Sequence, residues 1–353
     1  MHYRILGAGP SGLAAAITLA RAGHDVDVYE RRRDCGARFG GDLQGLENWS
    51  TPTDVLHELR GHGLTVDFHC APVTRALQTN GDRESWLGFD RPGLYLVKRG
   101  TASDTLDQSL KRQALAVGAH IHFGETIDRA SADIVATGPR GKTIFAIDRG
   151  IVFETNSPDR VIVLMNDDAA PKGYAYLLIT NGYGCLATML FDDFPSVHRR
   201  LAHVQRLFQE RYAIDIRNPR PVGGVGHFGL GHTFHDGRAL HVGEAAGLQD
   251  FLWGFGIRSA IRSGVAAANC LLEQKDWGAE AVAQFEPLLQ ASVVNRFVFE
   301  TLRFGRYRLL MRLFQFGGPG ALLRSISKPT VLHRILLPAA RAYARRQYPR
   351  LEL

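Results

Sequence analysis

The sequence predicts an α/β protein with a parallel βαβ unit, a second domain built on an antiparallel sheet, and a helical C-terminal tail. Three observations support this fold class. An apolar strand, a glycine cluster, an alanine-rich helix and a second apolar strand follow one another between residues 3 and 33. Alternating apolar runs separated by turns fill residues 143–190. From residue 301 onward, arginines are interleaved with leucines and phenylalanines.

Size and composition set the first bounds. A chain of 353 residues exceeds one ordinary core and predicts two or three packed units. The hydrophobic fraction of 45% with 22% charged residues is typical of globular proteins. The sequence contains no run of about 18 uncharged apolar residues, so we expect no membrane span. The first strand begins at Tyr3 and leaves no room for a removable leader, while four scattered cysteines fit a reducing compartment. We therefore expect a cytoplasmic protein.

The opening segment contains the most informative motif. Gly7-Ala8-Gly9-Pro10-Ser11-Gly12 matches G-x-G-x-x-G directly after a strand and at the start of a helix. Gly7 permits the tight turn, Gly9 lets the backbone approach a pyrophosphate, and Gly12 lets the helix pack closely on the strand. The helix N-terminus then offers free N–H groups to the phosphates.

An acid completes this Rossmann-like unit. Glu30 ends the second strand, eighteen positions beyond Gly12, where a carboxylate accepts hydrogen bonds from an adenosine ribose. The motif does not separate FAD from NAD, but the acid disfavours a 2′-phosphate and hence NADP. A second match, residues 224–229, follows two prolines and lacks both the helix and the acid. We interpret it as a glycine-rich strand or turn, with a second nucleotide site as the alternative.

Together, the glycine motif with Glu30, the mid-chain stretch "DIVATG" and the later "GEAAG" followed by "WGFGI" resemble the FAD-dependent oxidoreductases of the p-hydroxybenzoate-hydroxylase fold. Within that superfamily the chain is similar to the geranylgeranyl reductase branch, through residues 171–179, "PKGYAYLLI". The resemblance covers roughly residues 3–275. Glu244 stands where the family usually has aspartate.

The resemblance implies FAD as cofactor and a set of cofactor-binding residues. The glycine loop would cradle the pyrophosphate, Glu244 would reach the ribityl chain, and residues 254–257 would lay backbone N–H groups along the flavin edge. The complete predicted set is Gly7, Gly9, Pro10, Ser11, Gly12, Glu30, Arg31, Arg38, Ala136, Thr137, Gly138, Gly243, Glu244, Gly254, Phe255, Gly256 and Ile257.

Candidate substrate-lining residues come from two regions, a polar loop after Glu30 and an aromatic strand. Each has a plain structural alternative: turn chemistry for the loop, sheet packing for the tyrosines and core packing for the tryptophan. These candidates are Asp42, Trp49, Tyr174, Tyr176 and Trp253. No catalytic residue and no metal ligand is identified, and Cys35 is read as a small buried residue.

The C-terminal tail concentrates the positive charge. Residues 301–353 hold eleven Lys and Arg and one acid, Glu352, so this segment carries a net charge of +10. Because the whole chain carries +7, residues 1–300 carry −3. Basic amphipathic helices lie on anionic membrane surfaces, or they pack on the protein with arginine stems covering apolar surface. Both alternatives stay open, with a kink or break expected at Pro338. Nucleic-acid binding is not expected.

These features predict a discontinuous FAD domain (residues 1–60, 98–142 and 233–285), a substrate domain (61–97 and 143–232) and a helical segment (286–353). The leading hypothesis is reduction of C=C bonds in an isoprenoid or other apolar lipid by hydride from reduced FAD. The alternatives are a flavin monooxygenase acting on an aromatic or quinone-like substrate, and a flavin-binding protein without turnover. The electron donor, NAD(P)H or a redox protein, is not distinguished. A location at the inner membrane face follows if the tail contacts lipid.

Overall fold

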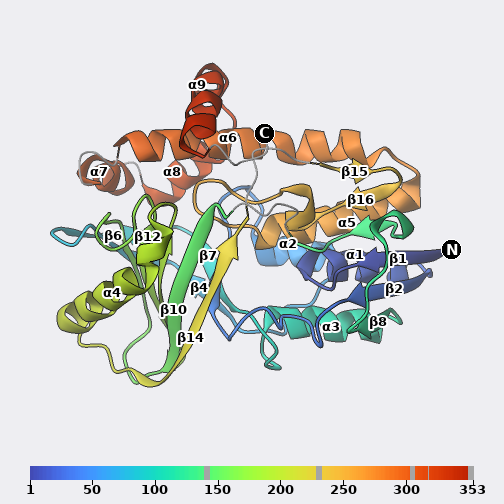
Figure 1. Cartoon of the computed structure of the whole chain (residues 1–353), viewed down its shortest axis with the longest axis horizontal. Coiled ribbons are helices and arrows are strands. Elements are labelled where there is room, and N and C mark those ends of the chain that lie inside the picture. Colours follow the sequence, from blue (N-terminus) through green and yellow to red (C-terminus); the bar gives the residue numbers. More distant parts are fainter. Residues whose placement is uncertain (139–143, 228–232, 303–306, 317, 349–353) are drawn as a thin grey trace.

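The computed structural model describes residues 1–138, 144–227, 233–302, 307–316 and 318–348. Within this part of the chain the strands form three sheets, and a row of C-terminal helices lies along one side of them (Figure 1). The long helix α6 (Trp277–Leu302) runs over both of the larger sheets, and α9 (Val331–Gln347) lies on the far side of α6 from them (Figure 1).

The first sheet contains the predicted βαβ unit. Its strand order is β15-β16-β9-β1-β2-β8, and every neighbouring pair is parallel except the hairpin of β15 and β16. The strands are β1 (His2–Leu6), β2 (Asp25–Glu30), β8 (His120–Phe123), β9 (Ile134–Val135), β15 (His235–Asp236) and β16 (Ala239–His241). This is the parallel, helix-covered sheet that the alternation of strands and helices predicts.

Three helices cover this sheet and share its core: α1 (Pro10–Arg21), α3 (Leu106–Ala116) and α5 (Ile257–Glu273). Small side chains let them come close. Ala14, Ala15 and Ala16 are fully buried, and a Cβ at Gly264 of α5 would collide with the backbone of Ser11 in α1. The glycine and alanine content of both helices therefore sets their close approach.

The second sheet is larger and mostly antiparallel, in the order β14-β10-β13-β12-β11-β5-β6. Its strands are β5 (Arg75–Thr79), β6 (Glu84–Gly88), β10 (Ala146–Glu154), β11 (Arg160–Leu164), β12 (Tyr174–Thr180), β13 (Tyr183–Leu190) and β14 (Arg217–Gly226). Helix α4 (Val197–Tyr212) covers one face by burying Val204 and Phe208 among the sheet's leucines and isoleucines. The second glycine motif begins within β14, as the strand interpretation predicts; its last residues, 228 and 229, lie outside the described residues.

A small third sheet corrects one expectation. Residues 31–50 were predicted to be a loop, but Leu43–Glu47 forms β3 and pairs antiparallel with β7 (Leu94–Lys98), which also pairs with β4 (Cys70–Val73). The strand is set by its distant partner, and Leu43 and Leu46 are buried. Beyond β3, the short helix α2 (Val55–Gly61) is capped by Asp54, whose side chain accepts from Leu56 N.

The predicted domain segments can be compared with sheet membership. Strands of the first sheet all lie in the three segments assigned to FAD, and strands of the second sheet lie in the two assigned to substrate. The third sheet joins β3 from a cofactor segment to β4 and β7 from a substrate segment. The boundaries themselves stay a prediction.

The C-terminal segment is helical in its described part, with α6, α7 (Arg308–Phe316), α8 (Pro319–Ile326) and α9. A buried arginine, Arg296 of α6, fixes this layer to the sheets: it donates to Lys172 O at 2.7 Å and to Glu300 Oε1 at 2.6 Å, and stacks 3.9 Å from the Phe191 ring centroid. No break separates the two halves of α9, which runs through Pro338 as one helix, so the break allowed for at Pro338 does not occur. Three short 3₁₀ segments, η1 (Arg129–Ser131), η2 (Phe194–Ser196) and η3 (Gly243–Ala246), complete the elements.

Candidate functional site

The glycine loop between β1 and α1 has two structural glycines and one that faces open space. Gly7 has φ +108°, and a Cβ there would lie 2.5 Å from Ala136 O. A Cβ at Gly12 would collide with Gly7 O. A Cβ at Gly9, by contrast, would meet no atom within 4 Å. The fold therefore requires Gly7 and Gly12 for its own packing, whereas Gly9 keeps a space clear beside the loop.

The N-terminus of α1 lacks an internal counter-charge. Its N-cap is Gly9, no side chain caps the helix, Pro10 occupies the first turn, and that turn holds no acid. The first N–H groups of a helix have no intrahelical partner and carry the positive end of the helix dipole. This end of α1 is therefore built to accept an anion such as a pyrophosphate.

Glu30 is held beside the same loop. Its Oε2 accepts from Ala8 N at 3.0 Å and its Oε1 from Arg32 N at 2.9 Å. The carboxylate at the end of β2 is thus fixed next to the glycine loop before any ligand arrives, in the position where it would accept from ribose hydroxyls. Arg31, the next residue, is exposed.

Residues from three distant segments meet next to this loop. Arg38 Nη1 donates to Glu244 Oε2 at 3.0 Å, although 206 positions separate them. A Cβ at Gly138 would lie 3.6 Å from the same Glu244 oxygen and 4.0 Å from Arg38 Nη1. A Cβ at Gly243 would press on Ser11 Oγ at 2.7 Å. The predicted residues of the Arg38 loop, the end of β9 and η3 are therefore brought together at the start of α1.

A second uncapped helix N-terminus belongs to α5. Gly256 is its N-cap, and neither a capping side chain nor a first-turn acid is present. Since Gly264 of α5 touches Ser11 of α1, the α5 N-terminus lies about 10 Å farther along the α5 axis, at 1.5 Å per residue. These two positive helix ends suit the two ends of a flavin dinucleotide, the diphosphate and the electron-rich ring edge.

The residues present therefore fit FAD. Gly9 leaves space for a pyrophosphate, Glu30 is placed for the ribose, and the amides that precede α5 would face the flavin ring. Gly254, with φ +80°, allows the chain to turn there, and Ile257 is buried under the first turn of α5. The Thr137 side chain accepts a hydrogen bond at its Oγ1 from Arg129 Nη2, at 3.2 Å.

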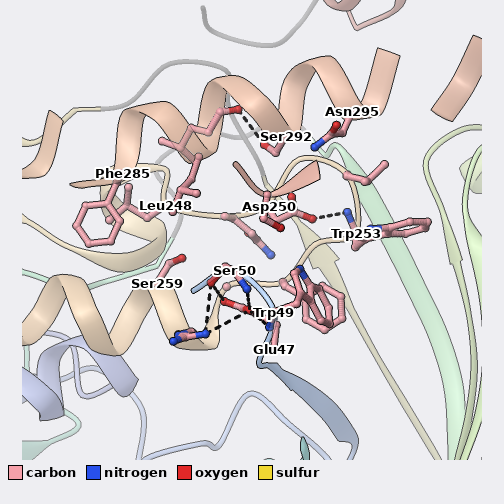
Figure 2. Close-up of a pocket in the computed structure, with 18 of the residues that line it drawn as sticks. Glu47, Trp49, Ser50, Leu248, Asp250, Trp253, Ser259, Phe285, Ser292 and Asn295 are labelled. Carbon is pink, nitrogen blue, oxygen red and sulfur yellow. Dashed lines mark hydrogen bonds and ion pairs between the residues drawn. The ribbon is translucent and has the colours of Figure 1, made fainter. Parts of the chain in front are cut away.

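A pocket of about 80 Å³ lies between the α5 N-terminus and α6 (Figure 2). Most of its surface is apolar and comes from the loop before α5, from Trp49 and from one face of α6. Trp49 and Phe255 meet edge to face, 5.0 Å between centroids. The apolar lining consists of Trp49, Leu248, Leu252, Trp253, Phe255, Phe285, Leu288, Leu289 and Ile326.

One wall of this pocket is a buried charge network. Arg258, 2% exposed in its side chain, contacts Glu58 of α2, Glu47 Oε2 at 3.6 Å and Thr51 Oγ1 at 2.5 Å. Burial alone would raise the pKa of Glu58, but its hydrogen bond to His62 and the charges of Arg258 and Arg262 outweigh burial and lower it to about 2. The two glutamates neutralise an arginine that sits in the first turn of α5, where a cation opposes the helix dipole.

A buried acid braces the loop before α5. Asp250 Oδ2 accepts from Trp253 N at 2.6 Å, and Asp250 N donates to Phe255 O at 2.8 Å (Figure 2). Burial raises the pKa of Asp250 to about 6, partly offset by backbone N–H donors, and the charge of Glu47 adds to the rise. Asp250 therefore exchanges its proton near neutral pH while lining the pocket.

The five predicted substrate-lining residues divide between two places. Trp49 and Trp253 line the pocket, and Tyr174 of β12 donates from its hydroxyl to Trp253 O at 2.5 Å. Tyr176 lies 6.2 Å from Tyr174, ring centroid to centroid, and burial raises the pKa of its hydroxyl. Asp42 does not line this pocket: it accepts from Gln44 Nε2 at 2.7 Å.

Asp42 instead faces the second sheet. Burial raises the pKa of Asp148 on β10, and the charge of Asp42 adds to that rise. Gln44 continues the contact to the buried pair of Arg99 and Asp107. Cys35 is 1% exposed, and burial raises its thiol pKa to about 12, in line with its interpretation as a buried structural residue.

Sequence reasoning missed Arg258, Glu58 and Asp250. Two of them carried a weak signal: Arg258 is the one cation in the first turn of a helix rich in small residues, and Asp250 is the one acid in the run from Ala245 to Gly256. Glu58 had no signal, because only the fold brings α2 beside α5.

Comparison with known proteins agrees with this geometry. Residues 5–66 match the family model of the NAD(P)-binding Rossmann-like domain. The chain is 22% identical over 333 residues to a digeranylgeranylglycerophospholipid reductase of Methanocella arvoryzae, covering 80% of this chain and 81% of the relative. It is 31% identical over 103 residues to the flavin-containing monooxygenase FMO GS-OX-like 5 of Arabidopsis thaliana, of which the match spans only 20%.

A solved structure extends the likeness over the whole chain. A geranylgeranyl bacteriochlorophyll reductase-like protein from Thermoplasma acidophilum superposes with a TM-score of 0.64, at 16% identity, covering 99% of this chain and 98% of that one. The resemblance expected from the sequence is therefore confirmed for the fold. The chain has the fold of the FAD-dependent oxidoreductases, with an NAD(P)-binding Rossmann-like domain at its start, and geranylgeranyl reductase-like proteins are among those that share it.

Proposed function

We propose that this protein binds FAD and reduces C=C bonds of an isoprenoid or other apolar lipid. The observation that carries the proposal is the pair of uncapped helix N-termini, α1 and α5, on two helices that touch at Ser11 and Gly264, with space kept clear at Gly9. The similarity to a digeranylgeranylglycerophospholipid reductase, over four-fifths of both chains, favours a lipid alkene as substrate.

The chain's own residues would perform four tasks. The α1 N-terminus, Ser11 and Arg38 bind the diphosphate, and Glu30 takes the adenosine ribose. The amides at the start of α5 stabilise negative charge on the reduced ring. Trp49, Trp253 and Phe255 exclude water and present an apolar surface to the alkene.

When bound, FAD supplies the hydride that adds to one carbon of the double bond. The other carbon needs a proton, which comes from water in the pocket or from Asp250, whose raised pKa lets it hold one near pH 6. The electrons that reduce the cofactor come from NAD(P)H or a redox protein.

The test is a single turnover without oxygen. The purified protein is reduced with dithionite and mixed with a phospholipid carrying geranylgeranyl chains, or with its saturated counterpart as control. We expect the flavin absorbance to return with the unsaturated lipid alone, with one double bond lost per flavin reoxidised. Reoxidation only on admission of oxygen, with a hydroxylated product, would favour a monooxygenase, and a flavin that neither NAD(P)H nor a redox protein reduces would favour a binding protein without turnover.

A further inference from the structure

The outward face of α9 is apolar where a solvated helix would be charged. Val331, Leu332 and Ile335 are 71%, 61% and 67% exposed. Among the described residues, ten large hydrophobic side chains are exposed, and half of them lie in α7 or α9. A concentration of this kind marks an interaction surface rather than the scattered apolar residues of an ordinary surface.

The opposite face of α9 is already used. Ala340 and Ala344 are buried against α6, Tyr343 donates to Glu300 Oε2 at 2.6 Å, and His333 Nε2 meets Asn295 Oδ1 at 3.1 Å. At about 100° per residue, Val331 and Ile335 lie on the other side of the helix from the two alanines. The helix is therefore fixed to α6 by one apolar face and leaves a second one exposed. The helix itself lies on the side of α6 away from both sheets (Figure 1).

A row of cations borders this outward face. Arg334, Arg341 and Arg345 are exposed and follow the spacing i, i+7, i+11, which places them along one side of the helix. On α7, Leu309 and Leu313 are 48% and 44% exposed beside exposed Arg308 and Arg312. From residue 301 to 351 the sequence has no acid.

The arginines beside the exposed apolar face of α9 indicate which kind of partner would cover that face. A second copy packed face to face through α9 would set these arginines against their own kind, and like charges across an interface cost stability. A polyanion such as a nucleic acid would satisfy the arginines and leave the valine, leucine and isoleucine in water. A bilayer with anionic headgroups satisfies both, because apolar side chains enter the acyl boundary while the arginines stay among the phosphates.

We propose that α9 docks the protein onto the surface of an anionic phospholipid bilayer. In the described part of the chain no helix is long and apolar enough to cross a membrane. The proposed contact is therefore peripheral. It is argued from α9 alone and does not depend on the reaction proposed above.

The test is vesicle flotation with the full-length protein, which needs no turnover. We expect about tenfold tighter binding to vesicles of phosphatidylcholine mixed with phosphatidylglycerol than to phosphatidylcholine alone, weakening as salt is raised. The double variant Leu332→Ser/Ile335→Ser should lose about tenfold in affinity for the mixed vesicles. Arg341→Gln should lose about fivefold.

Matched controls keep the result decisive. Leu115→Ser removes another half-exposed leucine, on α3, and should bind like wild type. Because Leu332 and Ile335 point outward, the double variant should keep the wild-type circular dichroism and flavin content. Equal vesicle binding by wild type and double variant, or no binding by either, would overturn the proposal. So would sedimentation showing a wild-type dimer that Leu332→Ser/Ile335→Ser splits, since a second copy would then cover the face.

Discussion

Gly9 is the residue at which ligand binding and folding can be separated. Its backbone φ is −81°, which any residue adopts, and a Cβ there meets nothing within 4 Å. We therefore expect Gly9→Val to fold, with a loss of about 1 kcal/mol because valine is a poorer N-cap than glycine. The variant should lose FAD, because the branched side chain fills the space where the pyrophosphate must approach. Flavin absorbance of the purified variant, together with its thermal midpoint, measures both effects.

Gly88→Val is the matched control for Gly9→Val. Gly88 ends β6, and its Cβ also meets open space, so this variant should stay folded and keep its flavin. Gly12→Ala should behave differently from both, since its Cβ collides with the Gly7 carbonyl and disturbs the loop itself. A Gly9→Val protein as yellow as wild type would show that the pyrophosphate lies elsewhere.

Asp250 predicts a pH dependence of stability. Its folded pKa of about 6 lies above the ordinary value of 3.8, so the folded state holds the proton more tightly than the unfolded state. The free energy of unfolding should therefore fall as pH rises from about 4 to 6 and level off above, by roughly 3 kcal/mol at most. Asp250→Asn should lack this component, since its side chain does not ionise.

Urea unfolding of both proteins across pH 4–7 measures this difference. Asp90→Asn, at an exposed carboxylate, serves as the control and should follow wild type. An Asp250→Asn curve parallel to wild type over the whole range would remove Asp250 as a titrating group.

Residue by residue, the motifs of the sequence predicted which residues lie together at the glycine loop better than which residues surround the pocket, and their role in binding a cofactor stays a prediction. The glycine loop, Glu30, Gly138 and Glu244 sit in motifs whose spacing reflects backbone geometry, and the structure brings them together. Arg258, Glu58 and Asp250 depend on which elements become neighbours, and no spacing in the chain encodes that. The position of Asp42 also depends on elements that are distant in the sequence. Its polar loop predicted a place at the substrate, but β3, which follows it, pairs with β7, and Asp42 lies toward the second sheet.

Among elements, the contact of β12 with the loop before α5 links the two larger sheets. The Tyr174 hydroxyl donates to Trp253 O at 2.5 Å. Tyr174→Phe leaves that carbonyl without this donor, so we expect a loss of about 1 kcal/mol in stability and a weaker hold on FAD. Denaturant unfolding and FAD titration of the apoprotein measure the two consequences.

Tyr212→Phe provides the comparison for Tyr174→Phe. Tyr212 donates to Glu84 Oε1 at 2.8 Å on the far side of the second sheet. Its loss should cost similar stability without changing FAD affinity. If both variants bind FAD as wild type does, the β12 contact does not shape the cofactor site.

The contact of α2 with α5 rests on the Glu58–Arg258 pair. Glu58→Gln leaves the buried Arg258 with Glu47, at 3.6 Å, as its remaining carboxylate partner, so the variant should be destabilised by about 2 kcal/mol at pH 7. The folded pKa of Glu58, about 2, is below its ordinary value, so the stability it contributes is present above pH 4.5 and lost as pH falls toward 2. Acid unfolding of Glu58→Gln should accordingly show a shallower pH dependence than wild type.

The elements themselves were largely predictable where local signals are strong. The βαβ unit and the strands of residues 146–190 follow from the glycine motif, turns and alternation. Strand β3 was not predictable, because residues 31–50 are rich in Gly and Arg and only pairing with β7 makes Leu43–Glu47 extended. Pro338 was expected to break α9, but packing of Ala340 and Ala344 on α6 holds the helix across it.

At the scale of the whole molecule, two sheets meet at the loop before α5, and a helical layer covers that meeting. Arg296 of α6 connects the layer to both sides by donating to Lys172 O beside β12 and to Leu252 O at 3.3 Å in the loop. The C-terminal helices are therefore part of the site's construction. They also carry the exposed apolar face of α9 and the arginines beside it, and the proposed membrane contact would bring the pocket close to the lipids of a bilayer.

The central claim is that this chain holds FAD between the N-termini of α1 and α5. The most direct measurement is to purify the folded protein, release any chromophore by heat, identify it by mass, and titrate the apoprotein with FAD. The account predicts a yellow protein with one FAD per chain, or an apoprotein that takes up one equivalent. A colourless protein that is folded and fails to take up FAD would contradict it.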